Sequence, residues 1–197
     1  VELLRDGRGY STRHVRGYQN EKPVFITTAS FQVPEAGAGY QPGMPPVPGP
    51  DELPSSAEYL AANAGADPAA ADYWSLGRSF DMRHVPGPVY VRVEGERVPH
   101  QAVWVKAFDA LPDDANTHRI AVSYVCDYTI LEPSLRVLGL DWSSPGLVTA
   151  SLDHAMWFHG RARADEWLLY AQEAAGAQNG RGLNLGRFFT RDGALVA

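Results

Sequence analysis

The chain has 197 residues, a length that allows one large domain or two small ones. Hydrophobic residues make up 45% of the chain and charged residues 20%, which is ordinary for a globular protein. The formal net charge of −6 argues against nucleic acid as a partner, because phosphate binding needs a basic face. A small anionic ligand stays compatible with this charge, since a local arginine cluster can oppose the overall sign.

Cysteine content and the ends of the chain bear on cellular location. Cys126 is the only cysteine, so no intrachain disulfide can form, and we expect a reducing, cytoplasmic setting. There is no run of about 18 apolar residues and no opening signal peptide, so we expect no membrane span. Strand-like sequence begins near Val1, and only four residues follow the turn signal Asp192-Gly193. We therefore expect the chain to be part of a longer protein, with residues missing at both ends.

The first fifty residues predict a hairpin and then a loop. Residues 10–17 and 23–32 are the expected arms, and the second arm is rich in β-branched and aromatic side chains. Residues 19–22 form the expected turn between them. In residues 33–50, ten of eighteen positions are Pro or Gly, a composition typical of an irregular loop.

Short helices and strands are expected next. Residues 55–62 and 69–76 have helical patterns, and Ser55 or Ser56 is suited to cap the first helix. Strands are predicted at three places along the following thirty residues. These are residues 79–84, 89–93 and 101–108.

Residues 113–131 give the strongest helix prediction. Asp113 and Asp114 would lie at the positive end of its dipole, and Pro133 would end it. Because apolar residues occupy much of its circumference, we expect this helix to be buried. The rest of the chain predicts a meander of antiparallel strands. These are residues 147–158, 167–173 and 182–190, followed by a short return strand after Gly193.

An internal similarity indicates a duplicated unit. Gly7-Arg8-Gly9 and Gly180-Arg181-Gly182 each open a hairpin arm, and a turn signal follows each triplet at about the same interval. A long helix followed by a strand meander, occurring twice, predicts an α+β fold of two antiparallel sheets, each wrapped around a helix, although the first copy lacks its helix in this sequence.

Common catalytic and ligand-binding signatures are absent from the sequence. There is no G-x-S-x-G elbow, no phosphate-binding loop, no H-E-x-x-H and no cysteine pair, so we expect no metal site. Cys126 lies in an apolar helix and fits a core position better than a catalytic thiol. Four arginines cluster late in the chain, where they are either solvated or face ligand phosphates. They are Arg161, Arg163, Arg181 and Arg187.

Asp127 and Ser151 each have two interpretations. Asp127 has apolar neighbours whose packing would desolvate it and raise its pKa toward the range of a general base. Alternatively, it is a charge on the solvent-facing edge of the helix. Ser151 is either a functional hydroxyl or an ordinary strand hydroxyl bonded to the backbone.

The segment 151–170, SLDHAMWFHGRARADEWLLY, concentrates polar and aromatic side chains. On a strand, Asp153 and His154 point to opposite faces, so a direct Asp–His dyad is not expected. His154 and His159 likewise face opposite ways and make a poor metal pair. The tryptophans of this segment are expected in the core. They are Trp157 and Trp167.

Four stretches of the chain resemble the acyl-CoA thioesterase II family. They are VELLRDGRGYSTRHV at 1–15, TASFQVPE at 28–35, SLDHAMWFH with DEWLLY within 151–170, and RGLNLGRFFTRDGALVA at 181–197. The resemblance covers the C-terminal two-thirds of the family and implies its double hotdog fold, with the first hotdog incomplete at its N-terminus. It implies three regions. Residues 1–50 are the remainder of the first hotdog and a loop, 51–78 a helical linker, and 79–197 a second hotdog truncated in its last strand.

The resemblance also implies an activity and a site. Members hydrolyse acyl-CoA thioesters to fatty acid and CoA through a water molecule activated by Asp, Thr or Ser, and Gln. The corresponding residues are Asp127 and Ser151, and the Gln is expected beyond Ala197. CoA enters as part of the substrate, no cofactor is expected, and a homo-oligomer is expected.

Two other functions stay open. Hotdog enoyl-CoA hydratases use an Asp and a His five residues later, but the fifth residue after Asp127 is Glu132, which counts against hydration. A non-catalytic acyl-CoA binding module is the other alternative.

Overall fold

The computed structural model describes residues 1–63 and 66–197. The chain forms two compact units, Val1–Tyr40 and Gln41–Ala197. Each unit contains one antiparallel sheet, so the fold is α+β as predicted. Among the described residues, none of the helices has both the length and the apolar character needed to cross a membrane.

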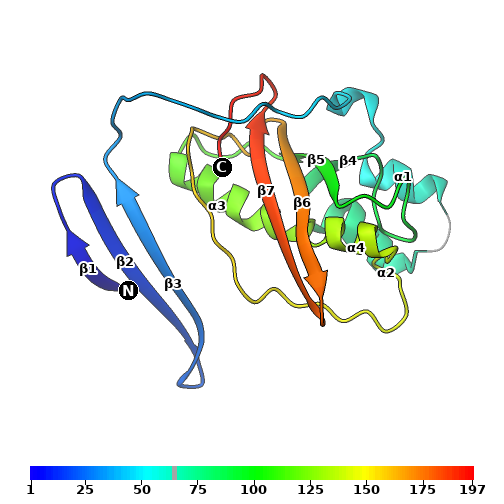
Figure 1. The fold of residues 1–197 in the computed structure, drawn as a ribbon, viewed down its shortest axis with the longest axis horizontal. Coiled ribbons are helices and arrows are strands. Elements are labelled where there is room, and N and C mark those ends of the chain that lie inside the picture. The colour runs from blue at the N-terminus through cyan, green and yellow to red at the C-terminus, as the bar shows by residue number, and fades with distance from the viewer. Residues whose placement is uncertain (64–65) are drawn as a thin grey trace. The chain divides into compact units, whose positions relative to one another are not determined.

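The first unit is a three-stranded antiparallel sheet (Figure 1). Its strands are β1 (Glu2–Asp6), β2 (Tyr10–Gln19) and β3 (Lys22–Gln32). Asn20 and Glu21 connect β2 to β3 with φ angles of 48° and 63°, the left-handed geometry of a tight hairpin turn. The predicted hairpin is therefore confirmed. Residues 33–49 contain no helix or strand, in agreement with their Pro/Gly content.

Short helices open the second unit. They are η1 (Pro50–Glu52), α1 (Ser56–Ala62), α2 (Pro68–Asp72) and the π-helical turn η2 (Tyr73–Gly77). Ser55 caps α1, because its side chain accepts a hydrogen bond from the Glu58 N–H while the Glu58 carboxylate accepts from the Ser55 N–H. Residues 64 and 65 of the predicted linker 51–78 lie outside the described residues.

The second unit is built on a four-stranded antiparallel sheet in the order β4-β5-β6-β7. Its strands are β4 (Phe80–Val85), β5 (His100–Ala107), β6 (Leu168–Gln178) and β7 (Arg181–Thr190). The predicted return strand is present as a short pairing with β7, since Phe189 bridges Leu195 and the Phe188 N–H donates to the Ala197 carbonyl.

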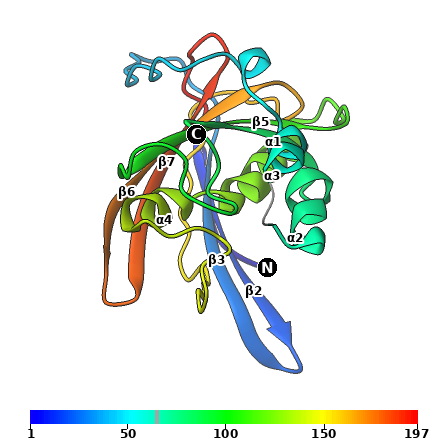
Figure 2. The same ribbon diagram turned by 90° about the vertical axis from the view of Figure 1, so that its right-hand side faces the viewer.

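Strand β5 divides the core between the two faces of this sheet. Val103, Val105 and Ala107 pack on one face with Val122 and Val125 of helix α3 (Ala115–Val125). Figures 1 and 2 show α3 along that face. On the opposite face β5 packs against the segment around η1, residues 44–53. That contact is made by Ala102 and Trp104 with Met44, Val47 and Leu53. The side chains of β5 thus alternate between the two faces of the sheet, as its sequence predicts.

The predicted helix 113–131 is wrong in its length. Asp114 caps α3 by accepting from the Thr117 N–H, but α3 ends at Val125 and a 3-10 turn, η3 (Cys126–Tyr128), follows. Pro133 lies in the first turn of another helix, α4 (Glu132–Leu138), instead of ending one. A first-turn residue needs no N–H for an intrahelical bond, so proline is tolerated there. The predicted burial holds for one side of α3 only, as Ile120 is 70% exposed.

Two predicted strands are absent. Residues 89–93 form no strand, although Val89 and Tyr90 are fully buried and Tyr90 stacks on Trp74 at 4.8 Å between ring centroids. Residues 147–158 also form no strand. A strand needs a hydrogen-bonded neighbour as well as an alternating sequence. The core prediction for Trp157 is wrong, because that side chain is 69% exposed.

Candidate functional site

The structure brings Asp127 and Ser151 into contact. Asp127 lies in η3 and Ser151 in the irregular segment that follows α4, 24 positions later. The Ser151 hydroxyl Oγ donates a hydrogen bond of 2.7 Å to Asp127 Oδ1. Both residues are exposed, so solvent and ligand can reach this pair.

The exposure of Asp127 bears on the desolvation expected of its carboxylate. Its apolar neighbours predicted a desolvated carboxylate, but the side chain lies on the solvent-facing edge of the turn. The residues around it are buried instead. Cys126 is 3% exposed and donates from Sγ to the Ser123 carbonyl at 3.0 Å, and Thr129 is 1% exposed. Burial of these neighbours fixes the backbone while the carboxylate projects outward.

Two further contacts attach the segment 151–156 to the end of α3. His154 Nε2 lies 3.5 Å from Cys126 Sγ, and the Ser123 hydroxyl lies 3.5 Å from Met156 Sδ. The segment therefore runs back along the helix, with positions 151, 154 and 156 facing 127, 126 and 123. Met156 carries no sequence signal for this contact, apart from its place in an alternation of apolar and polar residues.

Cys126 is a core thiol and not a nucleophile. Desolvation, followed by the negative charge of Asp127, raises the pKa of the Cys126 thiol from 9.0 to about 12. Because the thiolate is the reactive form, the thiol is inert near neutral pH. Its assignment to the core is confirmed by its place in the main cluster of buried side chains.

Tyr128 is covered by a buried arginine. Arg78 is only 4% exposed, and its guanidinium carbon lies 5.1 Å from the centroid of the Tyr128 ring. Cation–π attraction of this kind is strongest when the cation is desolvated. Arg78 thus holds the residue that follows Asp127 in the chain.

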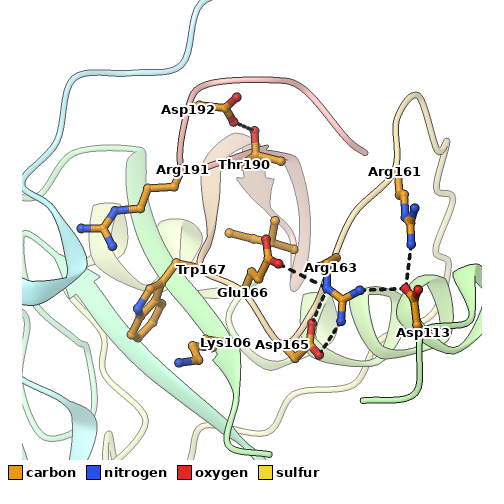
Figure 3. A pocket seen from close by; sticks show the side chains of 11 residues that line it. Lys106, Asp113, Arg161, Arg163, Asp165, Glu166, Trp167, Thr190, Arg191 and Asp192 are labelled. Carbon is orange, nitrogen blue, oxygen red and sulfur yellow. Dashed lines mark hydrogen bonds and ion pairs between the residues drawn. The ribbon is translucent and has the colours of Figure 1, made fainter. Parts of the chain in front are cut away.

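A second polar region is a cleft of about 730 Å³ beside α3 and the start of β6 (Figure 3). Arg161 and Arg163 both donate to Asp113 Oδ1, at 2.7 and 2.8 Å, and Arg163 also donates to Asp165. Burial opposes ionisation of Asp165, but hydrogen bonds from the Leu111 N–H and Arg163 lower its pKa below the ordinary value. The carboxylates of the cleft therefore already neutralise its two late arginines.

The other two predicted arginines lie elsewhere, on β7. Arg187 pairs with Glu173 at 3.9 Å across the β6–β7 hairpin, and Arg181 begins β7. The four arginines thus do not form one cluster. Within residues 1–63 and 66–197, no group of three or more His, Cys, Asp or Glu side chains is placed to hold a metal ion.

Comparisons with known proteins agree with the resemblance seen in the sequence. Residues 77–197 match the family model described as acyl-CoA thioesterase. The chain is 34% identical to human acyl-coenzyme A thioesterase 8 over 207 aligned positions, which span all of this chain and 63% of that protein.

Solved structures extend the comparison to the fold. Acyl-CoA thioesterase II TesB2 from Mycobacterium marinum is 34% identical, with a TM-score of 0.76, over 99% of this chain and 68% of that one. A hot dog fold protein of unknown function from Alicyclobacillus acidocaldarius, 17% identical, has a TM-score of 0.67 over 99% of this chain and 67% of that one. The fold is therefore a hotdog fold, and the chain belongs to the acyl-CoA thioesterase family.

Proposed function

We propose that the protein containing this chain hydrolyses acyl-CoA thioesters to a free fatty acid and CoA. The observation that carries the proposal is the 2.7 Å hydrogen bond from Ser151 to Asp127. It joins two polar residues, distant in sequence, at an exposed position in a chain of this family. Human acyl-coenzyme A thioesterase 8 is named for this activity, and its similarity to the chain supports the same reaction here.

Asp127 is the proposed base. Ser151 occupies Oδ1, which leaves Oδ2 free to accept a proton from a water molecule. The water oxygen attacks the thioester carbonyl carbon, the carbon–sulfur bond breaks, and the proton held by Asp127 passes to the departing CoA thiolate. The lone pairs of Ser151 Oγ accept the second hydrogen of the water and orient it. Fixing a water in this way supplies much of the advantage of an intramolecular reaction.

A third group completes the proposed site. We expect a Gln beyond Ala197, which would help to hold the same water by a hydrogen bond. CoA enters as part of the substrate, and the reaction needs no cofactor. A homo-oligomer and a cytoplasmic location belong to the proposal on the strength of the family resemblance and the single cysteine, Cys126.

The finer architecture is also proposed. The sheet β1-β2-β3 would belong to an incomplete first hotdog, followed by the loop up to residue 50 and the linker 51–78. The sheet β4-β5-β6-β7 with α3 would form the second hotdog, 79–197, truncated in its last strand. In support, both Gly-Arg-Gly triplets lie where one antiparallel strand turns into the next: residues 7–9 precede β2, and residues 180–182 span the start of β7.

Hydration of an enoyl-CoA is a weaker alternative. Glu132, which stands where a hydratase has its His, is fully buried, and its carboxylate accepts hydrogen bonds from Gln101 and Trp142. A carboxylate enclosed in this way has no access to a substrate. A non-catalytic acyl-CoA binding module stays an outcome of the experiment below.

A thiol-release assay tests the proposal. The full-length protein is mixed with palmitoyl-CoA and shorter acyl-CoA substrates, and free CoA thiol is measured. Asp127→Asn is expected to lower kcat/KM by about 100-fold or more, the contribution typical of a positioned base. Asp153→Asn is the matched control, since Asp153 is an exposed neighbour of the site, and it should stay within about twofold of the wild type.

Two results would contradict the proposal. Binding of acyl-CoA without thiol release by the wild type would favour the binding module. Release that Asp127→Asn leaves unchanged would remove Asp127 from the mechanism.

A further inference from the structure

We propose that a buried chain of hydrogen bonds, Glu132–Gln101–Gln172–Thr129, positions the turn that carries Asp127. This inference rests on the proposed function, because Asp127 is the base in that proposal. The four residues act through the backbone of the turn and touch no substrate. They are therefore positioning residues.

The contacts are short and lie away from solvent. Gln101 Nε2 donates to Glu132 Oε2 at 2.8 Å and to Gln172 Oε1 at 2.9 Å. Gln172 Nε2 donates to Thr129 Oγ1 at 2.7 Å. Gln101 and Gln172 are 5% and 3% exposed, and Glu132 and Thr129 are 0% and 1% exposed. Every link is thus a buried hydrogen bond of ordinary length.

The sheet supplies a fixed base for this chain. Gln101 on β5 and Gln172 on β6 are direct cross-strand partners in the antiparallel register. Gln101 is two positions from Val103, and Gln172 is two positions from Tyr170. Residues two apart on a strand share a face, so both glutamines lie on the face that α3 covers. Neighbouring side chains on one face of a sheet are held about 5 Å apart, which suits a glutamine pair.

The charged neighbours of Gln101 set the donor-to-acceptor direction of these hydrogen bonds. Gln101 Oε1 faces Arg136, whose Nε lies 3.4 Å away, and Gln101 Nε2 faces the Glu132 carboxylate. A carboxylate only accepts and a guanidinium only donates, so the Gln101 amide has one orientation. The second N–H of Gln101 Nε2 donates to the amide oxygen of Gln172. The amide NH2 group of Gln172 therefore points toward Thr129.

Both ends of this hydrogen-bond chain reach the backbone that directly follows the turn with Asp127. Thr129 and Glu132 are also joined through the backbone, where the Glu132 N–H donates to the Thr129 carbonyl at 2.9 Å. Thr129 lies two residues after Asp127, and Arg78 covers the intervening Tyr128. Of these residues only Asp127 is exposed, so the anchors determine where its carboxylate points.

Stability alone does not explain this arrangement. Burying two amides and a carboxylate carries a desolvation cost, and well-packed apolar side chains of similar volume are often at least as stable. A fully satisfied polar network instead specifies one geometry of the segments that it joins. For a turn that carries a base, that geometry is the property that matters, since a displacement of about 1 Å can lower a rate 100-fold.

The test compares five variants of the full-length protein, one of which combines Gln172→Met with Thr129→Val. Gln172→Met and Thr129→Val remove one link each at similar volume, and Thr129→Ser keeps the hydroxyl. Gln178→Met is the matched control, because Gln178 lies on the same strand and is exposed. Amide hydrogen exchange of residues 126–131 and the kinetics of thiol release are measured for each.

We expect Gln172→Met and Thr129→Val to raise exchange in the turn about tenfold and to lower kcat about tenfold or more, with KM within about threefold. Thr129→Ser should restore both properties, and Gln178→Met should change neither. The double variant should lose no more than the worse single variant, because both remove the same link.

Unchanged exchange in the turn would overturn the inference, whatever the kinetics. Faster exchange with a wild-type kcat would also overturn it if Asp127→Asn abolishes activity. If Asp127→Asn keeps full activity, the proposed role of Asp127 fails separately, and exchange alone decides whether the chain positions the turn.

Discussion

His84 Nε2 of β4 lies 3.2 Å from Glu132 Oε2 of α4, and both side chains are buried. Desolvation acts to raise the pKa of Glu132. The nearby His84 and the hydrogen bonds from Gln101 and Trp142 outweigh it, so the pKa falls below its ordinary value of 4.5. The folded state therefore favours the ionised carboxylate, which links the stability of this region to pH.

Glu132→Gln tests that linkage. A carboxyl with a lowered pKa contributes stability that is fully present above about pH 4.5 and is lost as the pH falls through the folded-state pKa. The variant should be less stable at pH 7 by about 3–5 kcal/mol, because it breaks a buried pair. Below pH 4.5 its free energy of unfolding should decline less steeply than that of the wild type. Urea unfolding at several pH values measures both, and an unchanged acid slope would contradict the prediction.

Ser151→Ala should lower activity without lowering stability. Among the described residues the hydroxyl bonds only to the exposed Asp127 carboxylate, so its loss should change the free energy of unfolding by less than about 0.5 kcal/mol. In the proposed mechanism it orients both base and water, and kcat/KM should fall about 10- to 100-fold. Ser151→Thr keeps the hydroxyl and is the control. If the alanine variant stays fully active in thiol release, Ser151 is an ordinary hydroxyl.

The sequence predicted well those elements whose signals are local. The hairpin of β2 and β3 follows from its turn and its β-branched arm, and the alternation of β5 separates the two cores as expected. The strand prediction for residues 147–158 failed for a physical reason. Their alternation matches a strand, but strand pairing depends on a neighbour elsewhere in space. The prediction that Pro133 ends a helix failed because proline is compatible with the first turn of a helix as well as with a helix end.

The candidate site was only partly accessible from sequence. Spacing gave no reason for Ser151 to meet Asp127, and only the family resemblance paired them. The chain from Glu132 to Thr129 left no signal at all, because isolated glutamines at positions 101 and 172 look like surface residues until the strand register places them together. Networks between distant elements depend on register, which single-sequence patterns do not define.

Cys126 should resist alkylation in the folded protein. With its pKa raised to about 12 from 9.0, the thiolate fraction near pH 7.5 falls about a thousandfold. Burial at 3% exposure blocks the reagent as well. Iodoacetamide labelling followed by mass measurement should therefore be slow in buffer and fast in urea, where the thiol is exposed. Rapid labelling under native conditions would contradict the assignment of Cys126 to the core.

Gly186→Ala should destabilise the sheet. On β7 an added methyl group at Gly186 would meet the ring of Tyr170, with the Tyr170 hydroxyl oxygen only 2.8 Å away. The ring has little freedom to move, because it is 4% exposed and stacks on Phe188 with centroids 3.9 Å apart. Overpacking of this kind costs about 1–3 kcal/mol, which lowers Tm by about 2–4 °C per kcal/mol in a protein of this size.

Gly176 on β6 provides the matched control for this prediction. An added methyl group there has no atom within 4 Å, and the backbone lies outside the left-handed region, so Gly176→Ala should leave Tm nearly unchanged. Adding Tyr170→Leu to Gly186→Ala should recover part of the loss, since the smaller side chain removes the clash. Thermal unfolding of the three variants measures these differences. Equal Tm values for Gly186→Ala and Gly176→Ala would show that Tyr170 moves freely, which its stacking on Phe188 argues against.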